Sequence, residues 1–150
     1  MKFAREEIGL QLKVLYRDSD LIKARVFAWN GTFGGISDIY LAIDQLAGVA
    51  EQLQGFPQGI SDSREVMLGT FDPTSAGGGM SMRFYCIDRS GRAYVDTKIE
   101  SDQDSSGGVQ SVALSLPIEG GAVDSFVGEL RSLDAGERAT AYLRGTASVC

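Results

Sequence analysis

The first part of the chain carries two runs, residues 10–16 and 21–29, in which apolar and polar residues alternate. Alternation of this kind gives a β-strand one apolar face. A short Asp-Ser-Asp segment between the runs has the composition of a turn, so the sequence predicts a β-hairpin. Phe27 and Trp29 lie on the face opposite the alternating apolar residues, which makes the second strand apolar on both faces near its end.

A helical pattern follows over residues 37–54. Ser37 is placed to cap this helix, and Gly55 is placed to end it because glycine adopts the left-handed conformation without strain. A second helix is predicted over residues 122–134. The apolar stripe of the first helix repeats with the 3.6-residue period and consists of Ile39, Ile43, Leu46, Ala50 and Leu53.

The remaining pattern predicts further strands and a largely antiparallel arrangement. Strands outnumber helices and most connections are short enough for hairpins, which favours antiparallel pairing. We therefore expect one α+β domain over residues 1–150, with a mostly antiparallel sheet of about six to seven strands, two amphipathic helices on one of its faces, and a loose tail over 145–150. The further strands are expected at 65–71, 80–88, 92–99, 109–116 and 139–143.

The glycine-rich stretch WNGTFGGISD, residues 29–38, stands where a phosphate-binding loop could lie, between a strand and a predicted helix. It lacks the G-x-G-x-x-G spacing of a dinucleotide loop, and Ile36 stands where a P-loop needs lysine. Gly120-Gly121 precedes the second predicted helix in the same way. We expect both glycine pairs to turn the chain from sheet into helix, and their repetition hints at a distant internal duplication.

Composition and charge exclude several classes of function. The chain has no histidine and only two cysteines, which removes histidine-based catalysis, histidine metal ligands and a disulfide framework. The formal net charge of −6 disfavours nucleic acid and anionic lipid as partners and suits a basic protein. The sequence contains neither a cofactor-binding motif nor a recognisable spacing of catalytic residues. We therefore expect that the protein is not an enzyme and binds neither a cofactor nor a metal ion. The N-terminus lacks an apolar signal core and no run is long enough to span a membrane, so we expect a cytoplasmic protein.

Three aromatic residues around the predicted start of the first helix and three acidic residues along it form a candidate partner-binding surface. Aromatic side chains contribute strongly to interfaces, and acidic side chains suit a basic partner. The aromatic residues also have a structural interpretation, in which Trp29 and Phe33 close the end of the core beneath the helix. The six candidates are Trp29, Phe33, Asp38, Tyr40, Asp44 and Glu51.

Three segments carry a resemblance to known proteins: WNGTFGGISD at 29–38, CIDRSGRAYVDTKIE at 86–100 and VDSFVGELRSL at 123–133. The chain resembles a group of small uncharacterised bacterial α+β proteins related to immunity proteins for polymorphic toxins. Similar proteins often carry histidine just after the hairpin glycine, where this chain has Arg92. The resemblance implies a non-enzymatic, partner-binding role and carries over no catalytic residues.

Together these features predict a small acidic protein-binding domain, an immunity-type inhibitor that covers the basic active site of a toxin. Charge complementarity would speed association, and buried aromatic residues would supply affinity. The alternative is a small-molecule-binding or scaffold domain with an apolar pocket between sheet and helices, for which Phe27 and Trp29 are the motivating feature. The same apolar strand face would also allow a homo-oligomer.

Overall fold

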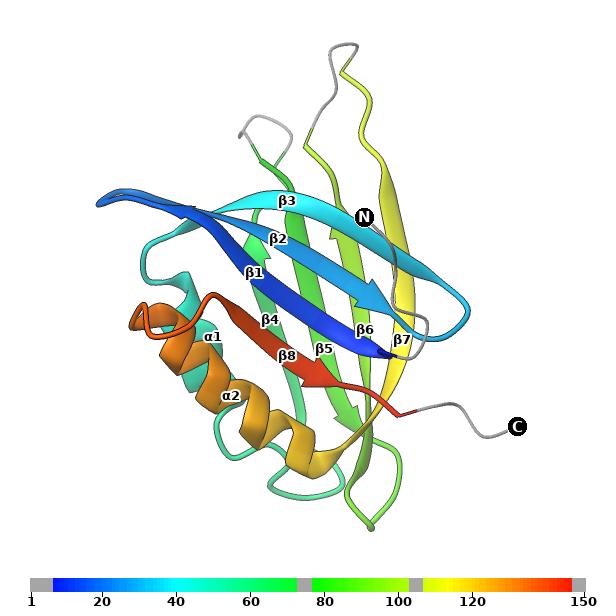
Figure 1. Cartoon of the computed structure of the whole chain (residues 1–150). Helices are drawn as coiled ribbons and strands as arrows, with labels where there is room; N and C mark the ends of the chain where they lie inside the picture. The colour runs from blue at the N-terminus through cyan, green and yellow to red at the C-terminus, as the bar shows by residue number, and fades with distance from the viewer. Residues whose placement is uncertain (1–6, 73–76, 103–106, 147–150) are drawn as a thin grey trace.

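In the described part of the chain, eight antiparallel strands form two sheets, and two helices lie together at one side of them (Figure 1). This is a computed structural model, which describes residues 7–72, 77–102 and 107–146. Sheet A has the strand order β3-β2-β1-β8, and sheet B has the order β4-β5-β6-β7. The elements are β1 (Gly9–Arg17), β2 (Leu21–Trp29), β3 (Gly34–Ala42), α1 (Gln45–Leu53), β4 (Ser63–Gly69), β5 (Gly79–Cys86), β6 (Arg92–Glu100), β7 (Ser111–Glu119), α2 (Gly120–Asp134) and β8 (Thr140–Arg144).

The expected α+β class and antiparallel pairing are confirmed, but the expectation of one sheet of about six to seven strands is wrong. The chain leaves sheet A at the end of β3 and returns to it only with β8, so the strands divide into two groups of four. The helices do not cover one sheet face as expected. They lie beside the edge strands, with α1 against β4 and α2 against β8 (Figure 1). The apolar faces of both sheets and both helices share a single core.

The predicted helix over residues 37–54 is the largest error of the sequence analysis. Residues 34–42 form β3, which pairs with β2 along its whole length, and the helix covers only 45–53. Ile39 satisfies both the helical and the alternating pattern, and pairing with β2 decides between them. Ser37 therefore lies within a strand, and Asp44 occupies the N-cap position without a side-chain cap bond. Gly55 has a φ of 81° just after the helix, as expected for its end.

The fold consists of two copies of one unit, residues 9–69 (repeat 1) and 79–144 (repeat 2). Each repeat runs strand-strand-strand-helix-strand, and its last strand pairs with the first strand of the other repeat. The strand registers make individual positions equivalent: Gly9 lies between Trp29 and Arg144, as Gly79 lies between Glu100 and Gly69. The sequence also repeats at this level, with GLQLK matching GMSMR in the first strands.

The two helices repeat a pattern as well. Residues 43–48, IDQLAG, match 123–128, VDSFVG, so that Gly48 and Gly128 occupy equivalent positions. The two Gly-Gly pairs identified in the sequence do not occupy equivalent positions in the two repeats. Gly34-Gly35 opens β3, whereas Gly120-Gly121 forms the first turn of α2. The expectation that both pairs turn sheet into helix is therefore wrong for the first pair.

Gly35 has a packing role where the two sheets approach. A Cβ atom at Gly35 would lie 2.4 Å from Cγ1 of Val112 on β7. By strand register Gly35 and Val112 are equivalent positions of the two repeats, because each pairs with the equivalent residue of the neighbouring strand, Ala28 or Ile99. A glycine in one repeat thus makes room for the valine of the other.

The segment after β8 was expected to be loose, and its first residues are held. The backbone N–H of Gly145 donates to the carbonyl oxygen of Ile8 at 2.8 Å, and that of Thr146 donates to Pro117 at 2.8 Å. The remainder of the expected tail, 147–150, lies outside the described residues.

Candidate functional site

The three aromatic candidates do not gather at a helix start. Trp29 is the last residue of β2 and half-buried, Phe33 is 63% exposed in the turn between β2 and β3, and Tyr40 lies toward the far end of that hairpin. Asn30 builds the turn, because its Oδ1 accepts the backbone N–H groups of Thr32 and Phe33. The glycine-rich stretch is therefore a hairpin turn and the beginning of β3.

Asp38 is engaged within the fold. It lies opposite Arg25 on the outer face of sheet A, and the guanidinium donates to both carboxylate oxygens at 2.7 and 3.1 Å. These hydrogen bonds lower the pKa of Asp38 below its usual value. A carboxylate held in this way is a cross-strand contact of the sheet rather than a free acidic group for a partner.

Asp44 and Glu51 come together as predicted, although on a shorter helix. Both are exposed on α1 and line one hollow of about 590 Å³ together with Gly48 and Met67. The spacing of four and three residues about Gly48 puts them on one helix face. Within the described residues, neither carboxylate makes an ion pair with another side chain.

A second hollow, of about 560 Å³, adjoins the first and shares Gln52 and Met67 with it. It continues across the outer face of β4 and β5 past Glu65 to Arg83. Met67, 45% exposed, lies where the two hollows meet. We call the combined feature the α1 groove and define it by Asp44, Gly48, Glu51, Gln52, Glu65 and Met67.

The α1 groove has an acidic lining, and among its apolar lining residues Met67 is the exposed one. Arg83 closes its far end, 3.9 Å from the carboxylates of Glu65 and Asp96. The Arg83 guanidinium also lies 4.9 Å from the ring centroid of Tyr85. Arg83 is thus shared between two acids, whereas Asp44 and Glu51 form no ion pair within the described residues.

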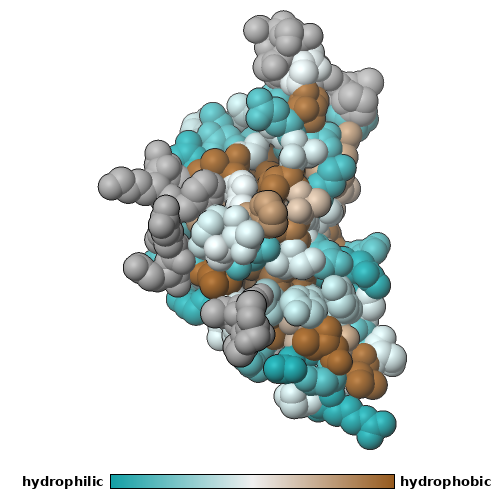
Figure 2. Space-filling model, turned by 90° about the vertical axis from the view of Figure 1, so that its right-hand side faces the viewer, coloured by the Kyte–Doolittle hydropathy of each residue, from teal (hydrophilic) through white to brown (hydrophobic). Residues whose placement is uncertain are grey.

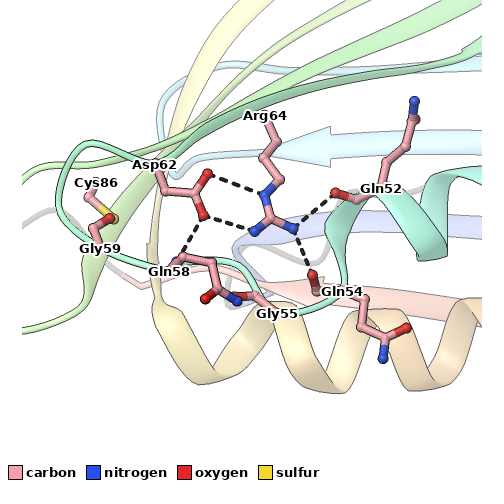
Figure 3. Close-up of polar contacts among 8 residues, drawn as sticks. All are labelled: Gln52, Gln54, Gly55, Gln58, Gly59, Asp62, Arg64 and Cys86. Atoms are coloured by element: carbon pink, nitrogen blue, oxygen red, sulfur yellow. Dashed lines mark hydrogen bonds and ion pairs between the residues drawn. The ribbon is translucent and has the colours of Figure 1, made fainter.

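Arg64 fixes α1 to β4 and so sets the shape of the groove (Figure 3). Its Nη1 donates to the carbonyl oxygens of Gln52 and Gln54 at 3.1 and 2.7 Å, which satisfies orphan acceptors at the helix C-terminus. Its Nε and Nη2 donate to the two carboxylate oxygens of Asp62 at 3.2 and 2.9 Å. One side chain thereby joins the end of the helix to the beginning of the strand.

Asp62 and Cys86 belong to this support rather than to a reactive site. The Arg64 hydrogen bonds lower the pKa of Asp62, which also accepts the backbone N–H of Gln58 at 2.8 Å. Burial raises the pKa of the Cys86 thiol, and the nearby Asp62 and Asp88 carboxylates raise it further. A thiol with a raised pKa is a poor nucleophile at neutral pH.

The equivalent surface of repeat 2 has a different charge. Glu51 on α1 corresponds to Arg131 on α2, and Asp96 at the centre of the outer face of sheet B corresponds to Arg25 on sheet A. Met67 corresponds to Tyr142 by the same registers. Of the three acids of the α1 groove, Asp44 corresponds to an acid, Asp124, whereas Glu51 and Glu65 correspond to Arg131 and Thr140.

A third hollow, of about 420 Å³, lies at the end of β1 and β8 on the outer face of sheet A. It is lined by Phe27, Gln11, Tyr142 and Arg144 among others, and Phe27 is only 9% exposed. The Nε2 atom of Gln11 donates to the Tyr142 hydroxyl at 3.4 Å. The space between the sheets and helices is filled by core side chains, so the expected apolar pocket is not found there among the described residues.

The side of the molecule remote from the helices has no continuous apolar surface in its visible described part. Figure 2 shows hydrophobic residues there as separate patches divided by hydrophilic ones. Scattered exposed apolar residues are normal for a protein surface. A smaller hollow of about 220 Å³ lies where β3 approaches β6 and β7, with Gly35 and Val112 among its lining residues.

Two other features are absent from the described residues. These residues contain no group of three or more His, Cys, Asp or Glu residues that could hold a metal ion. They also contain no helix with the length and apolar character that crossing a membrane requires.

Comparison of the chain with protein-family models, curated proteins and solved structures found no match in any of the three.

The sequence analysis missed the residues that complete the groove, which are Gly48, Glu65, Met67 and the supporting Arg64. Gly48 was visible as an interior helix glycine between two acids on the same face. Met67 and Glu65 gave no signal, because only the pairing of β4 with β5 sets their face toward solvent beside α1.

Proposed function

We propose that this chain is a non-enzymatic protein-binding domain that uses the α1 groove to cover a basic site on a partner protein, as an immunity-type inhibitor covers the active site of a toxin. The observation that carries the proposal is the groove itself: two adjoining hollows that share exposed Met67 and are lined by Asp44, Glu51 and Glu65. Charge and an apolar contact point occur together, as interfaces require.

The charge of the groove would act mainly on association. A carboxylate-lined surface attracts a basic partner over a distance of roughly one Debye length, about 8 Å at physiological salt. Met67 would then supply an apolar contact that excludes water, because methionine adapts its shape to a partner surface. Inhibition in this scheme is steric, so it needs no reactive group on this chain.

The proposal is tested by capture on immobilised protein from the native cells, with three baits. These are the natural sequence, the double variant Asp44→Lys/Glu51→Lys, and the control Asp124→Lys/Glu137→Lys, which changes the net charge by the same amount on repeat 2. We expect one basic protein to be retained by the natural sequence and the control but not by the groove variant. Its retention should fall as salt is raised.

The captured protein is then expressed alone and together with each bait. Growth should be restored by the natural sequence and the control, and not by the groove variant. A partner that binds all three baits equally would show that the α1 groove is not its site. A partner whose own expression is harmless would remove the inhibitor role and leave only binding.

A second candidate function rests on the hollow beside Phe27. Its volume of about 420 Å³ lies in the usual range for small-molecule sites, and an apolar floor with a few polar groups is typical of them. The expectation of a small-molecule site is thus kept, at the end of β1 and β8 instead of between sheet and helices. Native mass spectrometry of protein purified from its own cells tests it: a co-purified ligand that is lost in Phe27→Ala supports this function, and ligand-free protein contradicts it.

A further inference from the structure

Gly48 lies in the middle of α1, and no packing contact among the described residues requires a glycine there. A Cβ atom built there would meet no atom within 4 Å, and the residue is exposed. Its φ is not positive either, so no backbone conformation requires glycine. Glycine in a helix interior destabilises the helix relative to alanine. Gly128, at the equivalent position of α2, shares these properties, so the surroundings of Gly48 distinguish the two glycines.

Gly48 lies in an acidic hollow, whereas Gly128 has Arg131 at the position equivalent to Glu51. Gly48 is flanked on the same helix face by Asp44 and Glu51, and all three line one hollow with Met67. Along an α-helix, positions 44 and 51 are separated by a rise of about 10 Å. The hollow therefore presents two carboxylates with a bare backbone surface between them and an apolar side chain at its wall.

We propose that this part of the α1 groove receives one arginine side chain of the partner, with its guanidinium lying flat over Gly48 between the carboxylates of Asp44 and Glu51. The inference rests on the proposed function, since it names the group recognised in the same groove. A guanidinium is planar, donates from several edges and is weakly hydrated on its faces, so it can lie on a bare backbone and on Met67 while its edges meet both acids. A lysine ammonium is a compact point charge, which suits one carboxylate at a time.

The fold supplies a matched control, because Gly128 occupies the equivalent position of α2. A Cβ atom at Gly128 also meets nothing within 4 Å. Gly48→Ala and Gly128→Ala should therefore raise Tm by similar amounts, about 2–4 °C, because each replaces an exposed helical glycine. Only Gly48→Ala should interfere with a guanidinium in the α1 groove.

The test is an NMR titration of isotope-labelled protein with the peptides acetyl-Gly-Arg-Gly-amide and acetyl-Gly-Lys-Gly-amide. With the arginine peptide we expect saturable shifts of the backbone amides of residues 44–52 and of the Met67 methyl group. The lysine peptide should bind at least threefold more weakly. Gly48→Ala should weaken binding of the arginine peptide at least threefold, and Gly128→Ala should leave it unchanged.

The outcomes separate this inference from the proposed function. If Asp44→Asn/Glu51→Gln abolishes the shifts while Gly48→Ala leaves the affinity unchanged, the groove binds cations but the guanidinium does not lie over Gly48. Equal affinity for the two peptides, or shifts that occur elsewhere on the surface, would also contradict the proposal that an arginine side chain lies over Gly48. The proposed function is decided separately by the capture experiment with lysine variants, which does not depend on Gly48.

Discussion

Sheet A and sheet B belong to equivalent parts of the two repeats, yet their outer faces differ in charge. On sheet A, Arg25 lies opposite Lys13 on β1 and pairs with Asp38 on β3. On sheet B the position equivalent to Arg25 is Asp96, which accepts hydrogen bonds from Tyr85 and Ser115 at 3.1 and 2.7 Å. Like charges directly opposite each other, such as Lys13 and Arg25, are unfavourable in a sheet, so Asp38 is needed to offset them.

The comparison separates residues that maintain the fold from residues that are free to change. Equivalent glycines at the beginning of β1 and β5, and equivalent helix stripes, remain alike in both repeats. Equivalent exposed positions differ, as Glu51 and Arg131 do. The acidic α1 groove lies beside sheet B, and Lys13 and Arg25 lie on the outer face of sheet A, which gives the molecule a charge asymmetry that its net charge of −6 does not reveal. The following predictions test which differences matter.

The largest expected effect comes from a glycine that both repeats share. Gly9 has a φ of 150°, and a Cβ atom there would lie 2.2 Å from the carbonyl oxygen of Leu143. At the equivalent Gly79 the nearest atom, the carbonyl oxygen of Thr70, is 2.7 Å away. We expect Gly9→Ala to reduce the free energy of unfolding by about 3–4 kcal/mol and Gly79→Ala by about 2 kcal/mol, because the backbone itself must move.

Chemical denaturation measures both values, with Gly121→Ala as control. A Cβ atom at Gly121 meets nothing within 4 Å, so this variant should be neutral or slightly stabilising. A tolerated Gly9→Ala would show that the pairing of β1 with β8, and with it the exchange of last strands between the repeats, is not as described.

The next effect compares the two arginines that close the helix C-termini. Arg64 donates to two carbonyl oxygens at the end of α1 and to Asp62, with its side chain 20% exposed. Arg17 donates to the carbonyl oxygens of Leu133 and Asp134 at the end of α2, both at 2.8 Å, but is exposed and has no described carboxylate partner. We expect Arg64→Met to cost about 2–3 kcal/mol and Arg17→Met about 1 kcal/mol in denaturation experiments.

A second measurement relates Arg64 to the groove. Because Arg64 joins α1 to β4, hydrogen exchange of the amides in the last turn of α1 should speed up in Arg64→Met more than in Arg17→Met. Equal stability losses and equal exchange in the two variants would mean that Arg64 has no special part in holding the groove.

Local patterns in the sequence predicted the strands well and the helix boundary poorly. The alternation in residues 10–16 and 21–29 is unambiguous, and the hairpin is confirmed. Residues 37–42 fit a strand as well as a helix, and only the neighbouring β2 decides. The division into two sheets was not predictable, because it depends on β8 pairing with β1 across most of the chain.

The candidate site divides in the same way. Asp44 and Glu51 were found because helical spacing is a local property. The aromatic candidates were misplaced because they were assigned to the start of a helix that begins later. Glu65 and Met67 could not be found, since their position beside α1 is set by tertiary packing alone. The internal repeat could have been recognised from the similar segments GLQLK and GMSMR. The hint of a duplication was based instead on the two Gly-Gly pairs, which are not at equivalent positions.

A smaller effect is expected where the repeats touch. Gly35→Ala would place a methyl group 2.4 Å from Cγ1 of Val112 and should cost about 1–2 kcal/mol. Val112→Ala should recover at least half of that loss in the double variant, since it removes the atom in contact. A double-mutant cycle measures the coupling energy. Additive effects of the two substitutions would contradict the close approach of β3 and β7 at this point.

The smallest effect concerns the cross-strand pair that distinguishes the outer face of sheet A. Hydrogen bonds from Arg25 lower the pKa of Asp38 in the folded state, so the pair contributes stability above the unfolded carboxyl pKa and loses it as pH falls through the folded value. Both side chains are about one-third exposed, so Asp38→Asn should cost only about 0.5–1 kcal/mol at pH 7.

Denaturation of the natural sequence and of Asp38→Asn from pH 7 down to acid pH provides the test. The difference in unfolding free energy should be constant near neutral pH and shrink below pH about 4, where the unfolded carboxylate also takes up its proton. In an Arg25→Met background the same substitution should show a much smaller pH dependence, because Arg25 is the main cause of the lowered pKa of Asp38 and Lys23 adds a smaller contribution. A difference that persists unchanged at low pH would mean that Asp38 stabilises sheet A through its shape rather than its charge, and that the charge contrast between the two sheets has no consequence for folding.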